Sequence, residues 1–210
     1  ARIGARRVFL VASKSLSRKT PAIGEIRAAL GEHYAGLFDE CIAHTPWPSV
    51  IAAAEAVRTA RPDLILTVGG GTPIDTVKIL QICLAHDVTK AEELDARRTS
   101  TRPSPVRQVA IPTTLSGAEF SNLGGGTDLR TRIKHSFTGA DIGPRSVILD
   151  PEITLHTPEW LWLSTGIRGV DHAVEALCSV DAHAYCDGLA LHALRLFAEG
   201  LPRTQAAPQD

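Results

Sequence analysis

The sequence predicts an α/β fold in which a parallel β-sheet is covered by helices and is followed by the beginning of an all-helical region. Short apolar runs of strand length alternate with amphipathic helical patterns as far as Asp150. The runs are apolar on both faces, which is typical of parallel strands buried between helices. Composition changes near residue 152, after which the sequence indicates helix. We therefore expect an α/β domain over residues 1–151 and the first part of a helical domain over residues 152–210.

The expected α/β domain begins with three strand-and-helix units. The helices are indicated by apolar residues at helical spacing, and an alanine-rich helix follows the proline-broken segment HTPWPS. In order, we expect a strand over 6–12, a polar loop, a helix around 23–30, a strand over 36–43, a helix over 50–61, a strand over 64–68 and a helix around 74–84.

The second half of the chain is less regular. Residues 92–105 are charged and rich in serine and proline, which predicts a surface loop. Strands are expected over 106–111 and 146–149, with a hairpin between them in NLGGGTDLRTRIKHSF that turns at its glycines. Thr157 is then expected to cap a helix with Pro158 as its first residue. Two amphipathic helices follow, at roughly 165–179 and 184–200.

Bulk properties favour a small-molecule partner. A formal net charge of -1 provides no basic surface for nucleic acid or anionic lipid. No apolar run is long enough to span a membrane, and the N-terminal apolar segment is too short for a signal peptide. We therefore expect a cytoplasmic protein. The 4 cysteines lack any close spacing and are expected to be reduced, without a disulfide or zinc role.

The most informative motif is TVGGGTPIDTVK, residues 67–78, where a buried strand leads through three glycines into a helix. Glycines let the backbone approach a ligand, and a helix start presents unpaired N–H groups, so the motif could hold a phosphate. It is neither GxGxxG nor a GK[ST] phosphate loop. A purely structural alternative is also open, because Thr72 as N-cap, Pro73 at N1 and Asp75 at N3 would start a helix whatever the loop binds.

A second motif, PTTLSGAEFS at residues 112–121, is rich in hydroxyl groups and follows a predicted strand. The carboxyl ends of strands are where α/β sheets bind ligands, although such residues are also common in turns.

Together, GGGTPIDTVK, IPTTLSGAEFSN, VILDPEITLHTP and LSTGIRGVDHAVEALCS occur in the order and spacing of the iron-containing alcohol dehydrogenase superfamily. Within it the chain most resembles the maleylacetate reductase branch, and LALHALRLFAEGLPR strengthens the resemblance. Members of the superfamily are longer, so a short N-terminal piece and most of the helical domain are expected to be missing. The resemblance implies a dehydroquinate synthase-like architecture, with NADH or NADPH as cofactor and a homodimer as assembly.

The resemblance also implies roles for individual residues. Asp75 would brace the glycine loop, and Lys134 would reach a cofactor ribose. Without the resemblance, Lys134 could equally be a solvent-exposed lysine of the hairpin. The pyrophosphate would be held by Gly69, Gly70, Gly71 and Thr72, and the cofactor would be lined by Thr113, Thr114 and Ser116.

The corner after the first strand bears on cofactor choice. Many superfamily members have an acidic residue there, which binds the adenosine ribose and repels a 2′-phosphate. This chain has Ser13 and Lys14 instead. We therefore expect NADPH to be tolerated along with NADH, unless the segment is an ordinary polar loop.

The helix containing GIRGVDHAVE carries the expected catalytic residues. Ile167, Val170, Val174 and Leu177 would form its buried stripe. Metal-using relatives have an aspartate four residues before the histidine that matches His172, and this chain has Arg168 there. An arginine beside a divalent cation is strongly unfavourable, so the usual metal site is not expected, and His172 would be the ligand if a metal were present.

We predict instead that Arg168 binds a substrate carboxylate while His172 donates or relays a proton. The alternative is that Arg168 pairs with Asp171 or Glu175 and His172 is an ordinary hydrogen-bonded histidine. The reaction that the resemblance implies is NAD(P)H-dependent reduction of maleylacetate to 3-oxoadipate, in the setting of aromatic-compound catabolism. Two other functions stay open: a metal-dependent alcohol or polyol dehydrogenase, and a nucleotide-binding or interaction module without turnover.

Overall fold

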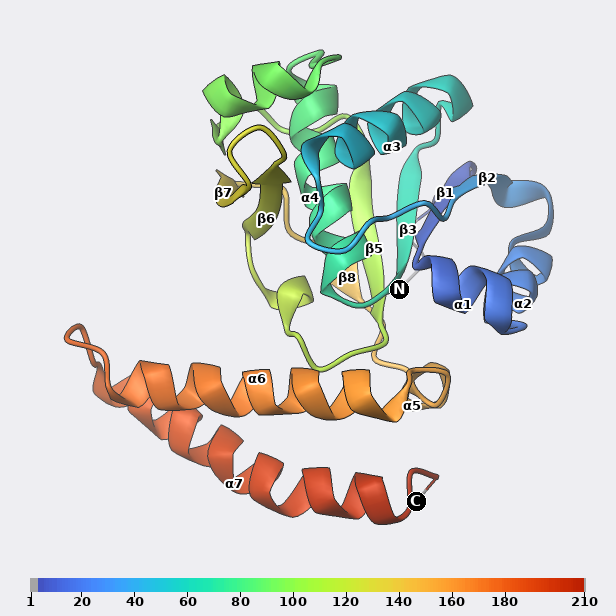
Figure 1. Cartoon of the computed structure of the whole chain (residues 1–210). Coiled ribbons are helices and arrows are strands. Elements are labelled where there is room, and N and C mark those ends of the chain that lie inside the picture. The colour runs from blue at the N-terminus through green and yellow to red at the C-terminus, as the bar shows by residue number, and fades with distance from the viewer. Residues whose placement is uncertain (1–3, 210) are drawn as a thin grey trace. The chain divides into compact units, whose positions relative to one another are not determined.

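The computed structural model describes residues 4–209, so the ends of the predicted domains, residues 1–3 and 210, lie outside the described residues. The chain divides into two compact units (Figure 1). Unit 1 contains the residues up to Thr113 together with Ala118–Asp150, and unit 2 contains Thr114–Gly117 and the residues from Pro151 on. No helix in the described residues is long and apolar enough to cross a membrane.

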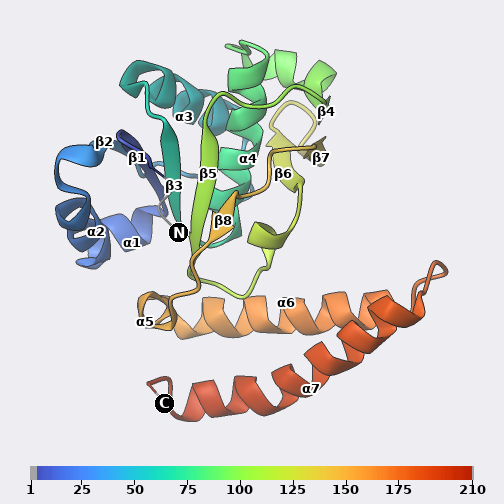
Figure 2. The same ribbon diagram turned by 180° about the vertical axis from the view of Figure 1, so that it is seen from behind.

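Unit 1 is built on a five-stranded sheet whose neighbouring strands all run parallel (Figure 2). The predicted parallel sheet is therefore confirmed. Its central strands are buried along their length because apolar side chains point to both faces. The order across the sheet is β2 (Tyr34–Phe38), β1 (Val8–Ala12), β3 (Leu64–Gly69), β5 (Arg107–Pro112) and β8 (Ser146–Val147).

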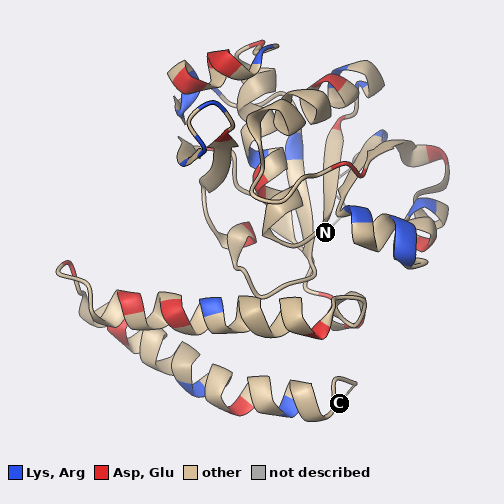
Figure 3. Ribbon diagram, in the orientation of Figure 1, with Lys and Arg blue, Asp and Glu red and all other residues tan. Residues whose placement is uncertain are grey.

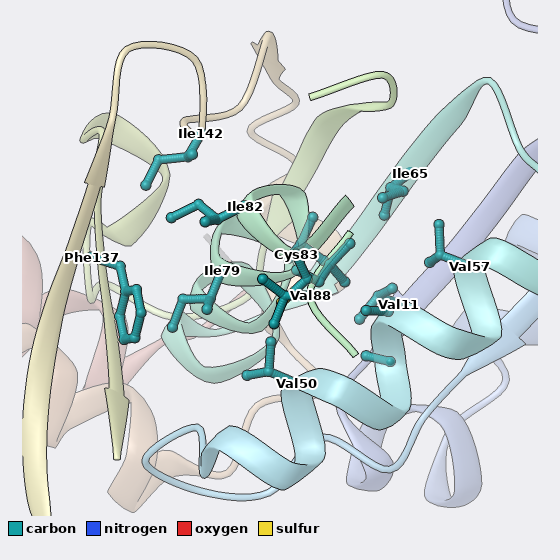
Figure 4. Packing of buried hydrophobic residues seen from close by; sticks show 14 of the residues in the cluster. Val11, Val50, Val57, Ile65, Ile79, Ile82, Cys83, Val88, Phe137 and Ile142 are labelled. Atoms are coloured by element: carbon teal, nitrogen blue, oxygen red, sulfur yellow. The ribbon is translucent and has the colours of Figure 1, made fainter. Parts of the chain in front are cut away.

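The main hydrophobic core joins strands β1 and β3 to two helices of unit 1, α3 and α4 (Figure 4). Valine, isoleucine and alanine side chains from α3 and α4 fill it, and Phe137 closes one side. The helices of unit 1 are α1 (Lys14–Lys19), α2 (Ala22–Leu30), α3 (Trp47–Ala60) and α4 (Gly71–Ala85).

Three predictions in this region were wrong. The polar loop after β1 contains α1, a short helix with one buried anchor, Leu16. Helix α3 begins at Trp47, inside the segment that was expected to be broken by prolines. Proline is tolerated in the first turn of a helix, because the N–H groups there have no hydrogen-bond partner within the helix. Strand β2 ends at Phe38 rather than continuing to residue 43, and the following loop has left-handed residues at His44 and Thr45.

A second, three-stranded sheet has the order β4 (Thr99–Ser100), β7 (Ile133–Gly139) and β6 (Leu123–Asp128). Strands β6 and β7 form the predicted antiparallel hairpin, but the glycine turn was wrong. Residues 129–132 make the turn, and the glycines 124–126 lie within β6. A Cβ on Gly126 would lie 2.7 Å from Ile79 Cδ1, so the glycines allow α4 to pack directly on the strand.

Residues 92–105 are more ordered than a surface loop. A 3₁₀ helix over Ala91–Arg97 is fixed by the fully buried Leu94, and β4 pairs with β7. The strand expected over 146–149 is shorter, since β8 ends at Val147.

Unit 2 contains α5 (Pro151–Thr154), α6 (Glu159–Leu177) and α7 (Ala184–Ala206). Both long helices are longer than predicted, and α7 continues through Pro202. Pro158 is the N-cap of α6 rather than its first helical residue, so Thr157 lies one position outside the cap.

The predicted buried stripe of α6 was partly wrong. Ile167 is 61% exposed and Val174 is 44% exposed, whereas Gly166 and Ala173 are buried. The buried stripe is shifted by one residue, about 100° around the helix. The cause is close helix packing: a Cβ on Gly166 would lie 2.5 Å from a side-chain carbon of Leu201 of α7.

Candidate functional site

The glycine loop joins the end of β3 to the start of α4 with a backbone conformation that only glycine accommodates easily. Gly69 has φ +147°, and a Cβ there would lie 2.7 Å from Pro73 Cγ and 3.3 Å from Ser13 Cβ. Gly70 is the N-cap, and α4 begins at Gly71. The expected N-cap, Thr72, was therefore wrong, because the three glycines let the helix start two residues earlier than a side-chain cap would require.

The N-cap residue, Gly70, has no side chain, so it provides no side-chain cap to the first N–H groups of α4. Thr72 lies in the first turn, where its carbonyl accepts a hydrogen bond of 2.9 Å from Thr76 Oγ1. Uncapped N–H groups and the positive end of the helix dipole favour an anion at this position. The local geometry therefore fits the predicted phosphate cradle.

Backbone hydrogen bonds hold three predicted site residues together at the carboxyl edge of the sheet. The Ser13 N–H donates to Val68 O over 3.2 Å, and the Thr113 N–H donates to Gly69 O over 3.0 Å. Ligands of open α/β sheets bind at this edge, where the strands end. The sheet thus places the corner after β1 and Thr113, the first residue after β5, beside the glycine loop.

A cavity of about 470 Å³ opens beside the start of α4. It is lined by cations and hydroxyl groups from α1, by the loop after β2 and by the first turn of α4. Its lining residues are Ser13, Lys14, Ser15, Arg18, Lys19, Cys41, Ala43, Thr72 and Pro73. Burial raises the pKa of the Cys41 thiol to about 12, so the thiol stays protonated at neutral pH.

Two carboxylates that the sequence did not reveal flank this cavity. Glu40 Oε2 accepts a hydrogen bond of 2.8 Å from Lys14 Nζ, and Asp39 Oδ2 accepts one of 3.2 Å from Arg18 Nε. Arg18 also pairs with Glu40. These contacts hold the pKa of Asp39 and of Glu40 below their usual values. The strand predicted over 36–43 included both residues, whereas they directly follow the end of β2 at Phe38.

Asp75 and Lys134 lie together against β6. Asp75 Oδ2 accepts a hydrogen bond of 3.1 Å from the Gly125 N–H, and Lys134 packs against the same glycine. Burial raises the pKa of Asp75, while the charges of Lys78 and Lys134 act in the opposite direction. Asp75 therefore connects the helix after the glycine loop to the hairpin, which is consistent with a bracing role.

Lys78 is an unpredicted feature of α4. Its ammonium group is fully buried and donates to Ala118 O at 2.5 Å, Leu123 O at 2.6 Å and Ser121 Oγ at 3.2 Å. It also lies 3.7 Å from Asp75 Oδ1. Burial lowers the pKa of Lys78. The side chain ties the end of the hydroxyl-rich motif, and Leu123 just after it, to α4. The signal available in the sequence was a lysine within an otherwise apolar stretch of helix.

The remaining predicted residues belong to unit 2. Thr114 Oγ1 donates to Ser116 Oγ over 3.2 Å, and the Leu115 N–H donates to Thr165 Oγ1 over 3.2 Å. The Thr114–Gly117 segment is therefore fixed to α6 through the backbone of Leu115.

Arg168 and His172 both lie on exposed positions of α6. Arg168 pairs with Asp171 and has Glu175 Oε2 at 3.9 Å from its Nη1. This is the ion-pair arrangement that the sequence left open as the alternative to substrate binding. Within residues 4–209, no three histidine, cysteine or acidic side chains are grouped so that they could hold a metal ion.

Comparison with known proteins identifies the family. The model of the family described as iron-containing alcohol dehydrogenase matches residues 1–151. The chain belongs to this family. The match includes the sheet and the glycine loop, and it confirms the superfamily predicted from the sequence motifs.

Relatives in the family have several different names. Dehydrogenase FUM7 of Gibberella moniliformis is 37% identical over 83% of this chain and 44% of its own length. A maleylacetate reductase of Rhizobium sp. is 30% identical over 100% of this chain and 52% of its own. The crystal structure of sulfoacetaldehyde reductase from Bifidobacterium kashiwanohense in complex with NAD+ is 25% identical, with a TM-score of 0.88 over 99% of this chain and 55% of that one. The chain thus spans about half the length of each of these three relatives.

Proposed function

We propose that this chain belongs to an NAD(P)H-dependent oxidoreductase in which residues 1–151 bind the dinucleotide and residues 152–210 begin the helical catalytic domain. The observation that carries the proposal is the glycine loop. It combines a glycine with φ +147°, an uncapped helix start and an adjoining cavity of about 470 Å³ at the carboxyl edge of a parallel sheet. Membership of the family supports the same reading.

The residues at this edge suit the parts of a dinucleotide. The N–H groups of Gly70, Gly71 and Thr72 can donate to pyrophosphate oxygens, because the N-cap residue has no side chain to occupy them. Ser13 and the cations of α1 line the cavity next to them and suit the adenosine ribose. Asp75 would brace the loop by holding the start of α4 to β6, through the hydrogen bond that it accepts from the Gly125 N–H.

For the substrate, we propose a carboxylate-bearing oxo acid such as maleylacetate. The bound nicotinamide supplies a hydride. Arg168 would bind a substrate carboxylate with its planar guanidinium. To do so, it would have to break its ion pair with Asp171 and pair with the substrate. His172, four residues further on the same helix face, would donate the proton to the adjacent carbon, because imidazole both gives and takes protons near neutral pH.

Charge reversal at Arg168 tests this role. In a protein that turns over maleylacetate with NADH, Arg168→Asp should lower kcat/KM for the diacid by about 100-fold, because a bidentate ion pair becomes a repulsion. Turnover of a simple alcohol should change much less. The measurement is a steady-state comparison of the two substrates.

The control is Arg195→Asp on α7. Arg195 forms a similar exposed helical ion pair with Glu199, and its side chain is 56% exposed against 55% for Arg168. The Arg195→Asp substitution should leave kcat/KM for both substrates nearly unchanged. Equal losses in the two variants, or an unchanged diacid rate in Arg168→Asp, would show that Arg168 only pairs with its helix neighbours.

A metal-dependent alcohol dehydrogenase is the second candidate, since the family takes its name from iron-containing enzymes. The residues around His172 do not suit a metal cation in this chain. Arg168 lies one helical turn before His172 on the same face of α6, and its positive charge would repel a cation. Stoichiometric iron or zinc that is lost together with activity on chelation would overturn the Arg168 proposal. A cytoplasmic homodimer that serves aromatic-compound catabolism remains part of the proposal.

A further inference from the structure

Lys78 is a buried charge that the proposed cofactor contacts do not use. It and Asp75 are the two charged residues of α4, so most of the helix is uncharged (Figure 3). A buried ammonium group is costly unless its donors are satisfied, and it has three of them. All three point at one segment, where they are accepted by Ala118 O, Leu123 O and Ser121 Oγ. The side chain therefore holds residues 118–123 against α4.

The hydroxyl-rich loop, residues 113–117, ends where this segment begins. At its start, the Thr113 N–H donates to Gly69 O over 3.0 Å. Directly after its end, Ala118 O accepts from Lys78 Nζ at 2.5 Å. Both anchors belong to one continuous stretch of chain, from Gly69 to Lys78, and that stretch also holds the N–H groups proposed to bind the pyrophosphate. The stretch therefore sets where the hydroxyl-rich loop begins and ends relative to the glycine loop.

The order of the strands indicates which half of a dinucleotide would reach this loop. The cavity beside α1 follows β1 and β2, the glycine loop follows β3, and the hydroxyl-rich loop follows β5. Strand β3 lies between β1 and β5 in the sheet. A dinucleotide with its adenosine at the cavity and its pyrophosphate at the glycine loop would therefore extend its nicotinamide half toward β5.

On this basis we propose that Lys78 is a positioning residue for the nicotinamide half of the cofactor. It fixes the end of the hydroxyl-rich loop, so that the hydroxyl groups of the loop stay at the distance from the glycine loop that the dinucleotide spans. The inference rests on the proposed dinucleotide function. Lys78 acts through the loop, because its own side chain is 0% exposed.

Calorimetric titration of the chain with NADH and with ADP tests this role, because ADP has the adenosine and both phosphates but lacks the nicotinamide half. We expect the wild type to bind NADH more tightly than ADP. Lys78→Met should weaken NADH binding by about tenfold, as for the loss of one or two hydrogen bonds, and ADP binding by less than about twofold. Methionine has no donor, so the end of the loop is released while the glycine loop is unchanged.

Leu94→Ala is the matched control. Leu94 is fully buried in the 3₁₀ helix that follows the C-terminal end of α4, whereas the glycine loop lies at the N-terminal end of α4. Truncating a buried leucine also destabilises the protein, but it should leave the NADH to ADP affinity ratio at the wild-type value. Thermal unfolding verifies that each variant is folded.

A milder variant, Lys78→Gln, keeps an amide donor at the same position. It should lower the NADH to ADP affinity ratio by less than Lys78→Met does, and it replaces Lys78→Met in the comparison if that variant does not fold.

The possible failures are distinguishable. If the wild type binds neither NADH nor ADP, the proposed dinucleotide function is itself wrong. If the wild type binds NADH no more tightly than ADP, the positioning role is overturned while binding of the adenosine half stands. The same conclusion follows if the affinity ratio in the Lys78 variant equals that in Leu94→Ala.

Discussion

Gly69→Ala is expected to lower the free energy of unfolding by about 3 kcal/mol, because it combines backbone strain with a steric clash. The residue has φ +147°, and the added methyl group would lie 2.7 Å from Pro73 Cγ, whose ring belongs to the first turn of α4. Either the loop or the helix start must shift. Chemical denaturation measures the loss, and dinucleotide affinity should fall with it because the N–H groups of α4 move.

Gly24→Ala is the matched control for this prediction. Gly24 lies within α2, and a Cβ there would meet nothing within 4 Å. Alanine in a helix interior loses less conformational entropy on folding, so this variant should be more stable by about 0.5–1 kcal/mol. Opposite signs for the two substitutions are therefore expected. A Gly69→Ala variant as stable as the wild type would contradict the described loop.

Lys78→Met is expected to destabilise the protein by about 3–5 kcal/mol, as for the removal of one partner from a buried charge pair. Methionine fills a similar volume but cannot donate. The carbonyls of Ala118 and Leu123 would lose their donor, and Asp75 would lose the opposite charge at 3.7 Å. Denaturation with urea provides the free energy of unfolding.

The control for Lys78 is Lys90→Met. Lys90 is exposed and precedes a 3₁₀ helix, so its substitution should change stability by less than about 0.5 kcal/mol. Hydrogen exchange adds a local readout, because the segment from Ala118 to Leu123 should exchange faster in Lys78→Met than in Lys90→Met. Equal stability in both variants would mean that the buried ammonium does not hold this segment.

The features predicted correctly from sequence depend on residues that are close together in the chain. The β3 run and the following glycines could be recognised because a buried strand and a helix start each have a local pattern. The parallel sheet followed from the alternation of such strands with helices. The family resemblance added the expected roles of these residues, which no spacing alone could indicate.

The features that were missed depend on residues far apart in sequence. Arg18 meets Asp39 21 positions later, and Lys78 meets Ala118 40 positions later. The glycines of β6 were assigned to a turn because the sequence cannot show that α4 packs on them. The buried stripe of α6 was displaced for the same reason, since the side chains of α7 pack against its glycines rather than its larger apolar residues.

Binding of NADH to wild type and to Gly70→Asp is the most direct test of the central claim, that the glycine loop holds a dinucleotide. Gly70 is the N-cap of α4 with φ -83° and ψ -160°, an extended conformation that aspartate adopts readily. Aspartate is a favourable N-cap, so the helix should keep or gain stability. Its carboxylate, however, would occupy and repel the phosphate position. We predict that NADH affinity falls by about 100-fold with no loss of thermal stability. Equal affinity of the two proteins for NADH would contradict the account.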